Sequence, residues 1–236
     1  MGVRIALDQC KSQFKWDRWN CPESSFATRY DNPATREMAF VSSITSAGIV
    51  HAVTRSCSRG AMPLCGCVKD SPPPDLQMQK IDEDNDSVQA EWEWRGCSDD
   101  VTMGALVAKT FLSALEGASA DVLSTVNLHN SQLGLAMVRD SVNPECKCHG
   151  MSGSCTTKTC WRRVESFSKI GDRMKHRYNR ALRVQMNSPR ISFDTPETSM
   201  VFIDESPDYC KMNATTGEAS ASEGILGLQL PLPMVL

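Results

Sequence analysis

The chain has 236 residues, of which 41% are apolar, and a net charge of −3. This length and apolar content allow one large domain or two small ones with a true hydrophobic core. No segment is expected to cross a membrane, because the apolar stretch 224–236 is short and broken by prolines. The apolar start, residues 1–7, is too short for a signal-peptide core.

Eleven cysteines stand in closely spaced clusters along the chain. Such clusters suit local disulfide loops in an oxidising compartment, and they argue against a cytosolic protein with buried free thiols. N-glycosylation sequons begin at Asn85 and Asn213 and favour the same secretory route. The number of cysteines is odd, so at least one has no partner within the chain.

The N-terminal 30 residues predict the end of a helix that turns into a cystine-closed loop, with Phe14, Trp16 and Trp19 as packing anchors. Asn32 followed by Pro33 suits a helix N-cap and first helical residue. Apolar residues then recur at helical spacing, which predicts a helix over 33–57. The cysteines at 57, 65 and 67 staple the turn that follows.

Residues 68–96 are acidic and polar and contain three consecutive prolines, which predicts an exposed loop. The run 98–100, Ser-Asp-Asp, can cap the next helix, which Gly117 ends. Asp121 can begin another helix that continues to Met137, with His129 in its middle as an ordinary hydrogen-bonded histidine. The apolar stripe of the first of these helices is expected to contain Leu106, Val107, Thr110, Phe111, Ala114 and Leu115.

The most informative stretch is 146–161, CKCHGMSGSCTTKTCW. Cys146 and Cys148 alternate, so they share one face of an extended arm. The Gly-x-Ser-Gly-Ser run contains the residues that a tight reversal needs. The pattern predicts a small hairpin held by cystines, with the Ser152 hydroxyl at its tip.

Three other interpretations of this stretch are open. The hairpin can be a stapled surface feature in which Ser152 has no role. Zinc is a second alternative because four cysteines and His149 supply enough ligands, although the adjacent Cys148 and His149 are poorly placed to bind one ion together. A serine hydrolase is disfavoured, since Ser154 stands where the nucleophile-elbow pattern requires glycine.

After the hairpin, apolar residues at helical spacing predict a helix over 162–186, and residues 200–203, MVFI, predict a short strand. This predicted helix also carries several basic residues, and such a basic face suits either polyanion binding or plain solvation. No nucleic-acid-binding motif accompanies it. The basic residues in question are Lys169, Arg173, Lys175, Arg177, Arg180 and Arg183.

Two of these stretches closely resemble signatures of the Wnt family of secreted signalling proteins. They are 146–161, given above, and 10–22, CKSQFKWDRWNCP. The segments 94–97, WRGC, 127–130, NLHN, and 205–210, ESPDYC, are also similar to the family. The resemblance covers about residues 3–213, apart from the acidic loop and residues 187–199, and it is greatest to the eighth subfamily.

The resemblance implies five disulfides and a lipid. The family pattern pairs Cys10 with Cys21, Cys57 with Cys65, Cys67 with Cys97, Cys146 with Cys160, and Cys148 with Cys155, and it leaves Cys210 unpaired in this chain. In a simple hairpin register the last two pairs are incompatible, so the arms would have to twist or bulge. By resemblance, Ser152 carries a covalent monounsaturated fatty acyl group. The implied receptor-binding hairpin comprises His149, Gly150, Met151, Ser152, Gly153 and Ser154.

The implied fold is mainly α: a disulfide-stapled helical bundle with a protruding cystine-closed β-hairpin. A Wnt N-terminal helical domain is expected over 1–205, with an acidic variable loop at 68–96 and the lipid-bearing hairpin at 146–160. Residues 206–236 are expected to start the linker to a C-terminal cysteine-rich domain that this chain lacks, and to end in an atypical tail. No catalytic residue, metal or non-covalent cofactor is expected.

The implied function is receptor ligation in the extracellular space or matrix. The expected partners are the Frizzled cysteine-rich domain, an LRP-type co-receptor, the Porcupine acyltransferase and Wntless carrier during secretion, and heparan sulfate. Two alternatives are open: a truncated decoy or incomplete gene model, and an unrelated secreted cystine-rich protein. A truncated ligand is expected to signal poorly, because it loses one of two linked receptor contacts.

Overall fold

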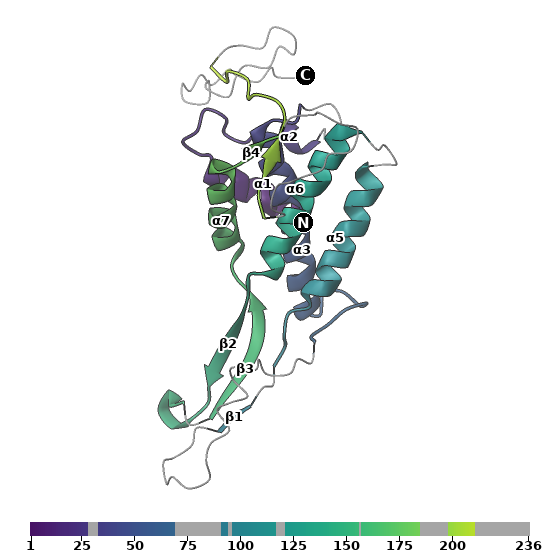
Figure 1. Cartoon of the computed structure of the whole chain (residues 1–236). Helices are drawn as coiled ribbons and strands as arrows, with labels where there is room; N and C mark the ends of the chain where they lie inside the picture. Colours follow the sequence, from purple (N-terminus) through teal and green to yellow (C-terminus); the bar gives the residue numbers. More distant parts are fainter. Residues whose placement is uncertain are drawn as a thin grey trace, which may run out of the picture.

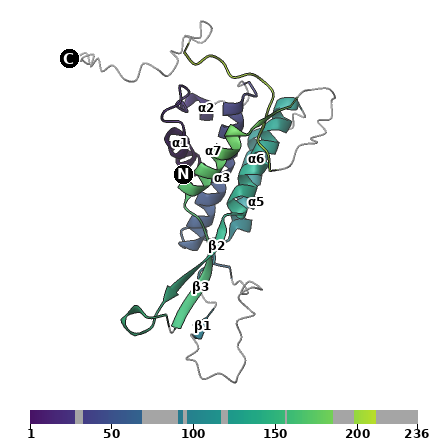
Figure 2. The ribbon, with the colours of Figure 1, turned by 60° about the vertical axis from the view of Figure 1, so that its left-hand side comes forward.

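The computed structural model describes residues 1–27, 33–68, 91–93, 96–116, 121–155, 157–184 and 198–210. In this part of the chain the helices gather into a bundle, and a long hairpin points away from one end of it (Figure 1 and Figure 2). The mainly α, disulfide-stapled architecture expected from the resemblance is therefore confirmed. None of the described helices combines the length and apolar character needed to cross a membrane.

The bundle consists of α1 (Gly2–Gln13), the short α2 (Ser24–Ala27), α3 (Arg36–Ser58), α5 (Val101–Glu116), α6 (Val122–Arg139) and α7 (Phe167–Asn179). Strands β2 (Val142–Cys148) and β3 (Thr157–Val164) form the antiparallel hairpin, and β1 (Glu91–Glu93) pairs with β3 in parallel. A second, two-stranded parallel sheet joins β4 (Leu182–Arg183) to β5 (Val201–Phe202).

Helix α3 is the centre of the bundle, and α1, α5, α6 and α7 all pack against it. Small residues allow this close packing. A Cβ added at Gly48 would lie 2.6 Å from the carbonyl oxygen of Gly2 in α1, and one added at Gly104 would lie 2.3 Å from Thr54 Oγ1. Helix backbones thus approach α3 more closely than larger side chains would permit.

The predicted start of α3 was wrong by three residues, since the helix begins at Arg36. Thr35 is its N-cap, and the backbone N–H of Met38 donates to Thr35 Oγ1 at 3.3 Å. Pro33 stands before the helix, and Asn32 lies outside the described residues. The backbone at Ala34 is held instead by a distant segment, because its N–H donates to Asp204 Oδ2 at 2.7 Å. Thr35 therefore supplies a local cap for the helix, and Asp204 holds the residue before that cap.

The starts of α5 and α6 are confirmed, and each has an aspartate cap. The N–H of Met103 donates to Asp100 Oδ1 at 2.9 Å, and the N–H of Ser124 donates to Asp121 Oδ1 at 2.8 Å. Both caps satisfy a backbone donor that has no partner within its helix.

The predicted apolar stripe of α5 was wrong. Leu106 and Phe111 are 59% and 42% exposed, whereas Ala108 and Leu112 are buried. The buried face of α5 carries Gly104 and Ala108, with Gly104 close to α3, and it also includes Leu112. The size of the neighbouring groove, and not hydrophobicity alone, selects the buried face.

The helix predicted over 162–186 is also shorter than expected. Residues up to Val164 continue β3, since the hairpin ladder extends to the pair Val142 and Val164. The helix α7 then runs from Phe167 to Asn179, and Leu182 already belongs to β4. The short strand predicted at 200–203 is confirmed as β5, whose pairing with β4 accounts for the early end of α7.

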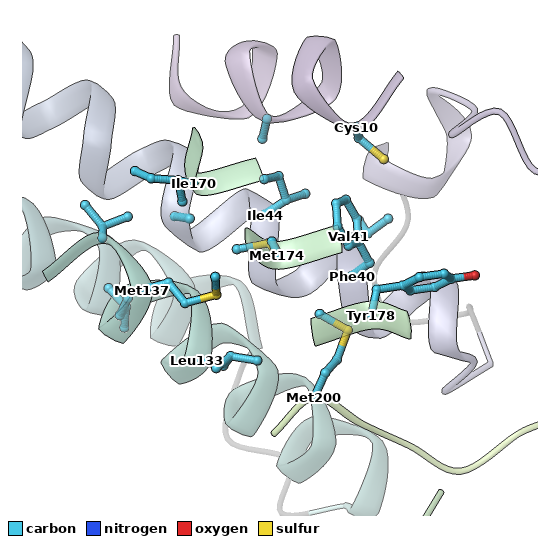
Figure 3. Close-up of a cluster of buried hydrophobic side chains, with 14 of the residues drawn as sticks. Cys10, Phe40, Val41, Ile44, Leu133, Met137, Ile170, Met174, Tyr178 and Met200 are labelled. Carbon is cyan, nitrogen blue, oxygen red and sulfur yellow. The ribbon is translucent and has the colours of Figure 1, made fainter. Parts of the chain in front are cut away.

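The core contains side chains from α1, α3, α6 and α7 that converge on one cluster (Figure 3). Phe14 lies within an aromatic group, with ring centroids 4.7 Å from Trp19, 4.8 Å from Phe40 and 4.9 Å from Tyr178, all edge-on. Phe14 and Trp19 are thus packing anchors as predicted. Trp16 is not, because it is 88% exposed.

A buried carboxylate ties the segment 205–210 to the bundle. The hydroxyl of Tyr178 donates to Glu37 Oε1 at 2.8 Å, and the hydroxyl of Ser206 donates to Oε2 at 2.6 Å. Burial raises the pKa of Tyr178 well above its ordinary value, and the nearby Glu37 charge raises it further. Tyr178 therefore stays a neutral donor, and Glu37 links the start of α3 to the end of α7.

Candidate functional site: the projecting hairpin

The register of the hairpin accommodates both of its cystines. Cys146 stands directly opposite Cys160 in the ladder, and these two residues form a disulfide. Cys148 stands opposite Lys158 but is bonded to Cys155, which lies in the loop between the strands. The twist or bulge expected for a tight turn is unnecessary, because one cystine joins the arms and the other closes the loop.

The tip places Ser152 in an uncommon backbone conformation. Ser152 has φ 56° and ψ 24°, and Gly153 follows with φ 78°, so two successive residues are left-handed. For a non-glycine residue this conformation costs about 1–2 kcal/mol. Backbone hydrogen bonds hold it in place, from the Gly150 N–H to the Ser154 carbonyl at 2.8 Å and from the Gly153 N–H to the Gly150 carbonyl at 3.0 Å.

The whole tip is open to solvent. Residues 151–155 are exposed, and Met151 is 92% exposed. The ring of His149 is 3.1 Å from Thr159 through Nε2 and Oγ1, which connects the loop to β3. The six residues expected to contact a receptor are therefore contiguous and accessible, and Ser152 lies in a strained, well-braced turn. Strain of this kind is a pointer to function.

The structure contains the five disulfides that the resemblance implied, including Cys10–Cys21, Cys57–Cys65 and Cys67–Cys97. The four hairpin cysteines are all consumed in disulfides, so they offer no thiolate to zinc. Among the described residues no group of three or more His, Cys, Asp or Glu could hold a metal ion. Cys210 forms no disulfide and lies exposed against the side chain of Arg18.

The base of the hairpin is anchored by Asp99, whose side chain is buried. The Val164 N–H donates to Asp99 Oδ2 at 2.8 Å, Arg55 Nη1 lies 3.3 Å from the same oxygen, and the Ser58 hydroxyl donates to Oδ1. Asp99 thus connects α3 to the last residue of β3. The sequence suggested only a helix cap in this region, and a lone aspartate carries no local signal for a long-range anchor.

His51 supports the same junction from α3. Its Nε2 is 3.1 Å from the Glu165 carbonyl oxygen, and its ring centroid is 5.2 Å from that of Phe167. Glu165 lies between β3 and α7, and Phe167 is the first residue of α7. The imidazole therefore braces the point where the hairpin joins the bundle.

We expect the free energy of unfolding to fall as the pH drops below 6.5, the ordinary pKa of histidine, and His51 to contribute to this loss. Burial lowers the pKa of His51 in the folded protein; Arg55 and Arg59 lower it further, and the Glu165 carbonyl and Asp99 oppose them. The unfolded chain then binds a proton at a higher pH than the folded protein, so acidification through this window favours unfolding. Urea unfolding followed at several pH values between about 7.5 and 5.5 measures the slope.

The matched variant is His51→Gln, which keeps a donor for the Glu165 carbonyl but does not titrate. Its unfolding free energy is expected to change less over the same pH range. Equal slopes for the two proteins would show that His51 is not responsible.

The basic face expected after the hairpin is smaller than the sequence suggested. Lys169 and Arg173 both pair with Glu165, and Arg183 pairs with Glu205 at 2.7 Å. Lys175 is mostly covered, with its Nζ 3.4 Å from the ring centroid of Phe14, and it also pairs with Asp17. Arg177 and Arg180 are exposed, and neither has an ion-pair partner among the described residues. The sequons at Asn85 and Asn213 lie outside the described residues.

A sequence model of the wnt family matches residues 1–224, and the chain belongs to the Wnt family. Mouse Protein Wnt-8a is 36% identical over 91% of this chain, and human Protein Wnt-8b is 38% identical over 92%. The alignments span 62% of the length of each of these curated relatives. The resemblance to the eighth subfamily is thus confirmed, and an unrelated secreted protein is excluded.

Two solved structures share the fold. The structure described as human WLS in complex with WNT8A matches with a TM-score of 0.66 and 34% identity, covering 92% of this chain and 69% of that chain. The Drosophila WntD N-terminal domain-linker matches with a TM-score of 0.64 and 25% identity, covering 89% of this chain and 95% of that chain. The bundle and its hairpin therefore have the Wnt N-terminal domain fold.

Proposed function

We propose that this chain acts as a secreted, lipid-modified signalling ligand and not as an enzyme. In this proposal Ser152 carries a monounsaturated fatty acyl ester, and the hairpin inserts that lipid into an apolar groove of a Frizzled cysteine-rich domain. The observation that supports it most is the position of Ser152, exposed in a braced left-handed turn at the tip of a hairpin closed by two cystines.

The energetics favour such an arrangement. Moving an acyl chain from water into an apolar groove yields about 0.8 kcal/mol for each CH₂ group. A bound tip must also lose conformational freedom, which opposes binding. The two cystines and the loop hydrogen bonds restrict the tip before it meets a receptor, so less freedom is lost on binding.

The remaining partners follow from the same proposal. Porcupine is the acyltransferase that would modify Ser152, and Wntless is the carrier that would accept the acylated chain. Wntless is supported by the likeness to WNT8A in its complex with human WLS. An LRP-type co-receptor and heparan sulfate are proposed as extracellular partners, and the five disulfides suit that compartment.

The direct test is a binding measurement. The acylated chain is secreted from cells, kept soluble in detergent, and bound to an immobilised Frizzled cysteine-rich domain. The wild-type chain is expected to bind, and the Ser152→Ala chain is expected to lose most of its affinity. A receptor domain with its groove filled by a free fatty acid serves as the matched control. Equal binding by acylated and unacylated chains would contradict the proposed role of the lipid.

Sulfated glycans are expected to bind weakly at the exposed end of α7. Replacing Arg177 and Arg180 together by glutamate should lower the salt concentration that elutes the chain from heparin, because exposed charges are screened over about 10 Å at 0.1 M salt. The control replaces Arg139 and Lys147 by glutamate, which changes the net charge equally at other exposed sites. If both double variants shift elution alike, binding depends on net charge and not on α7.

A further inference from the structure

A cavity of about 520 Å³ lies where the hairpin base meets the end of α3, away from the tip. We call it the arginine pocket. Its size lies within the range of small-molecule sites, about 300–1,000 Å³. Its lining consists of Arg55, Ser58, Arg59, Gly96, Cys97, Asp99, Trp161 and Arg163.

Regular elements place most of these side chains on the pocket. Arg55, Ser58 and Arg59 are spaced i, i+3 and i+4, so they share one face of α3. Trp161 and Arg163 alternate on β3 and share one face of that strand. The third wall of the pocket contains Cys97, which the disulfide to Cys67 holds in place. The walls of the pocket are thus a helix, a strand and a cystine.

The charges in the pocket are unbalanced. Its lining holds three guanidinium groups and one carboxylate, that of Asp99. The Asp99 side chain is 1% exposed, and its oxygens already accept from Arg55, Ser58 and the Val164 N–H. The carboxylate therefore presents almost nothing to a ligand, and a positive excess remains.

Arg59 and Arg163 are the groups available to a ligand. Arg59 is exposed and has no ion-pair partner among the described residues. Arg163 pairs with Glu145 at 3.0 Å, but both side chains are close to half exposed, and such surface pairs contribute only about 0–1 kcal/mol. Arg55 and Arg59 are like charges at i and i+4, and the Asp99 carboxylate pairs with Arg55 alone. Their combined charge also contributes to the lowered pKa of His51, after burial.

We propose that the arginine pocket binds an oxyanion, a sulfate or phosphate group, either free or borne on a small sugar. Guanidinium groups match the geometry of such anions because their donors form a planar fork. Trp161 lines the same pocket and adds an indole N–H donor, whereas the Ser58 hydroxyl already donates to Asp99. The pocket is distinct from the acyl-bearing tip and from the exposed arginines of α7.

The test is a titration of the oxidised full chain with sodium sulfate, followed by ¹H–¹⁵N spectra of the arginine Nε–H and tryptophan indole N–H groups. Sodium chloride at matched ionic strength is the reference. Sulfate is expected to shift the signals of Arg59 and Trp161 along a saturable curve. The variant Arg59→Ala is expected to bind about tenfold more weakly, the ratio that corresponds to one lost charge-assisted hydrogen bond.

The matched control is Arg4→Ala, at an exposed arginine of α1 that lies outside both the arginine pocket and α7, and this variant should bind sulfate as the wild type does. A parallel titration with a sulfated disaccharide identifies the source of the anion. Tighter binding of the disaccharide supports a sugar-borne group, and equal binding supports the free anion. Linear shifts that chloride reproduces, or unchanged affinity in Arg59→Ala, would overturn the proposal.

Discussion

A chain carrying Ser152→Ala is expected to acquire no label when it is secreted from cells that contain the Porcupine acyltransferase and an alkynyl fatty acid, whereas the wild type is labelled. The reason is that the alanine side chain has no hydroxyl on which an ester can form. The measurement is fluorescence of the secreted protein after coupling of a dye to the alkyne. The label at this position is expected to be either present or absent, with no intermediate level.

Two further variants make this result decisive. Ser152→Gly also lacks the hydroxyl, and glycine adopts the left-handed backbone of this turn without strain. Loss of label in both variants therefore reflects the missing hydroxyl and not a distorted hairpin. Ser154→Ala removes the nearest other hydroxyl, and this variant should label normally. Labelling of Ser152→Ala at the wild-type level would assign the ester to another residue.

Gly134→Ala is expected to destabilise the bundle severely. A Cβ at this position of α6 would lie 2.1 Å from the carbonyl oxygen of Ser43 and 2.2 Å from Ser46 Oγ, so α6 would have to move away from α3. Overpacking of this kind costs about 1–3 kcal/mol or more, which exceeds the gain of about 1 kcal/mol from the better helix propensity of alanine. The midpoint of urea unfolding should fall accordingly.

Gly66→Ala is the matched control for this comparison. A Cβ at Gly66 would meet nothing within 4 Å, so the same chemical change is made without a collision. Its stability should be unchanged or slightly higher, because alanine restricts the unfolded chain. A similar stability for the two variants would mean that α6 can shift on α3 at little cost.

The sequence predicts those parts of the fold that depend on nearby residues. Asp100 and Asp121 begin helices because a carboxylate two or three residues before a backbone N–H caps it wherever the helix lies. The start of α3 was misplaced because Asn32 and Pro33 were preferred to Thr35, the actual N-cap, and because the hydrogen bond from Ala34 to the distant Asp204 has no local signal. The face of α5 was misjudged because the closeness of α3 favours Ala108 over Leu106.

The hairpin also has a part that depends on nearby residues and a part that depends on distant ones. Residues 146–161 are contiguous, so their motif predicts both the hairpin turn and the position of Ser152 at its tip. The base of the hairpin depends on Asp99, and the arginine pocket depends on α3 and β3 together, with Arg59 and Arg163 far apart in the sequence. No spacing rule connects such residues, because only the completed tertiary structure brings them together.

The length of the hairpin turns small motions at its base into large ones at its tip. The seven residues of β2, at about 3.3 Å each, make an arm of about 23 Å. A tilt of about 10° at the junction would displace the tip by about 4 Å on this geometry, roughly the width of a hydrocarbon chain. If the hairpin tilts as a unit, Asp99, braced by His51, stands at its pivot. Under the proposed function such a tilt would set where the acyl chain arrives, far from the serine that would carry it.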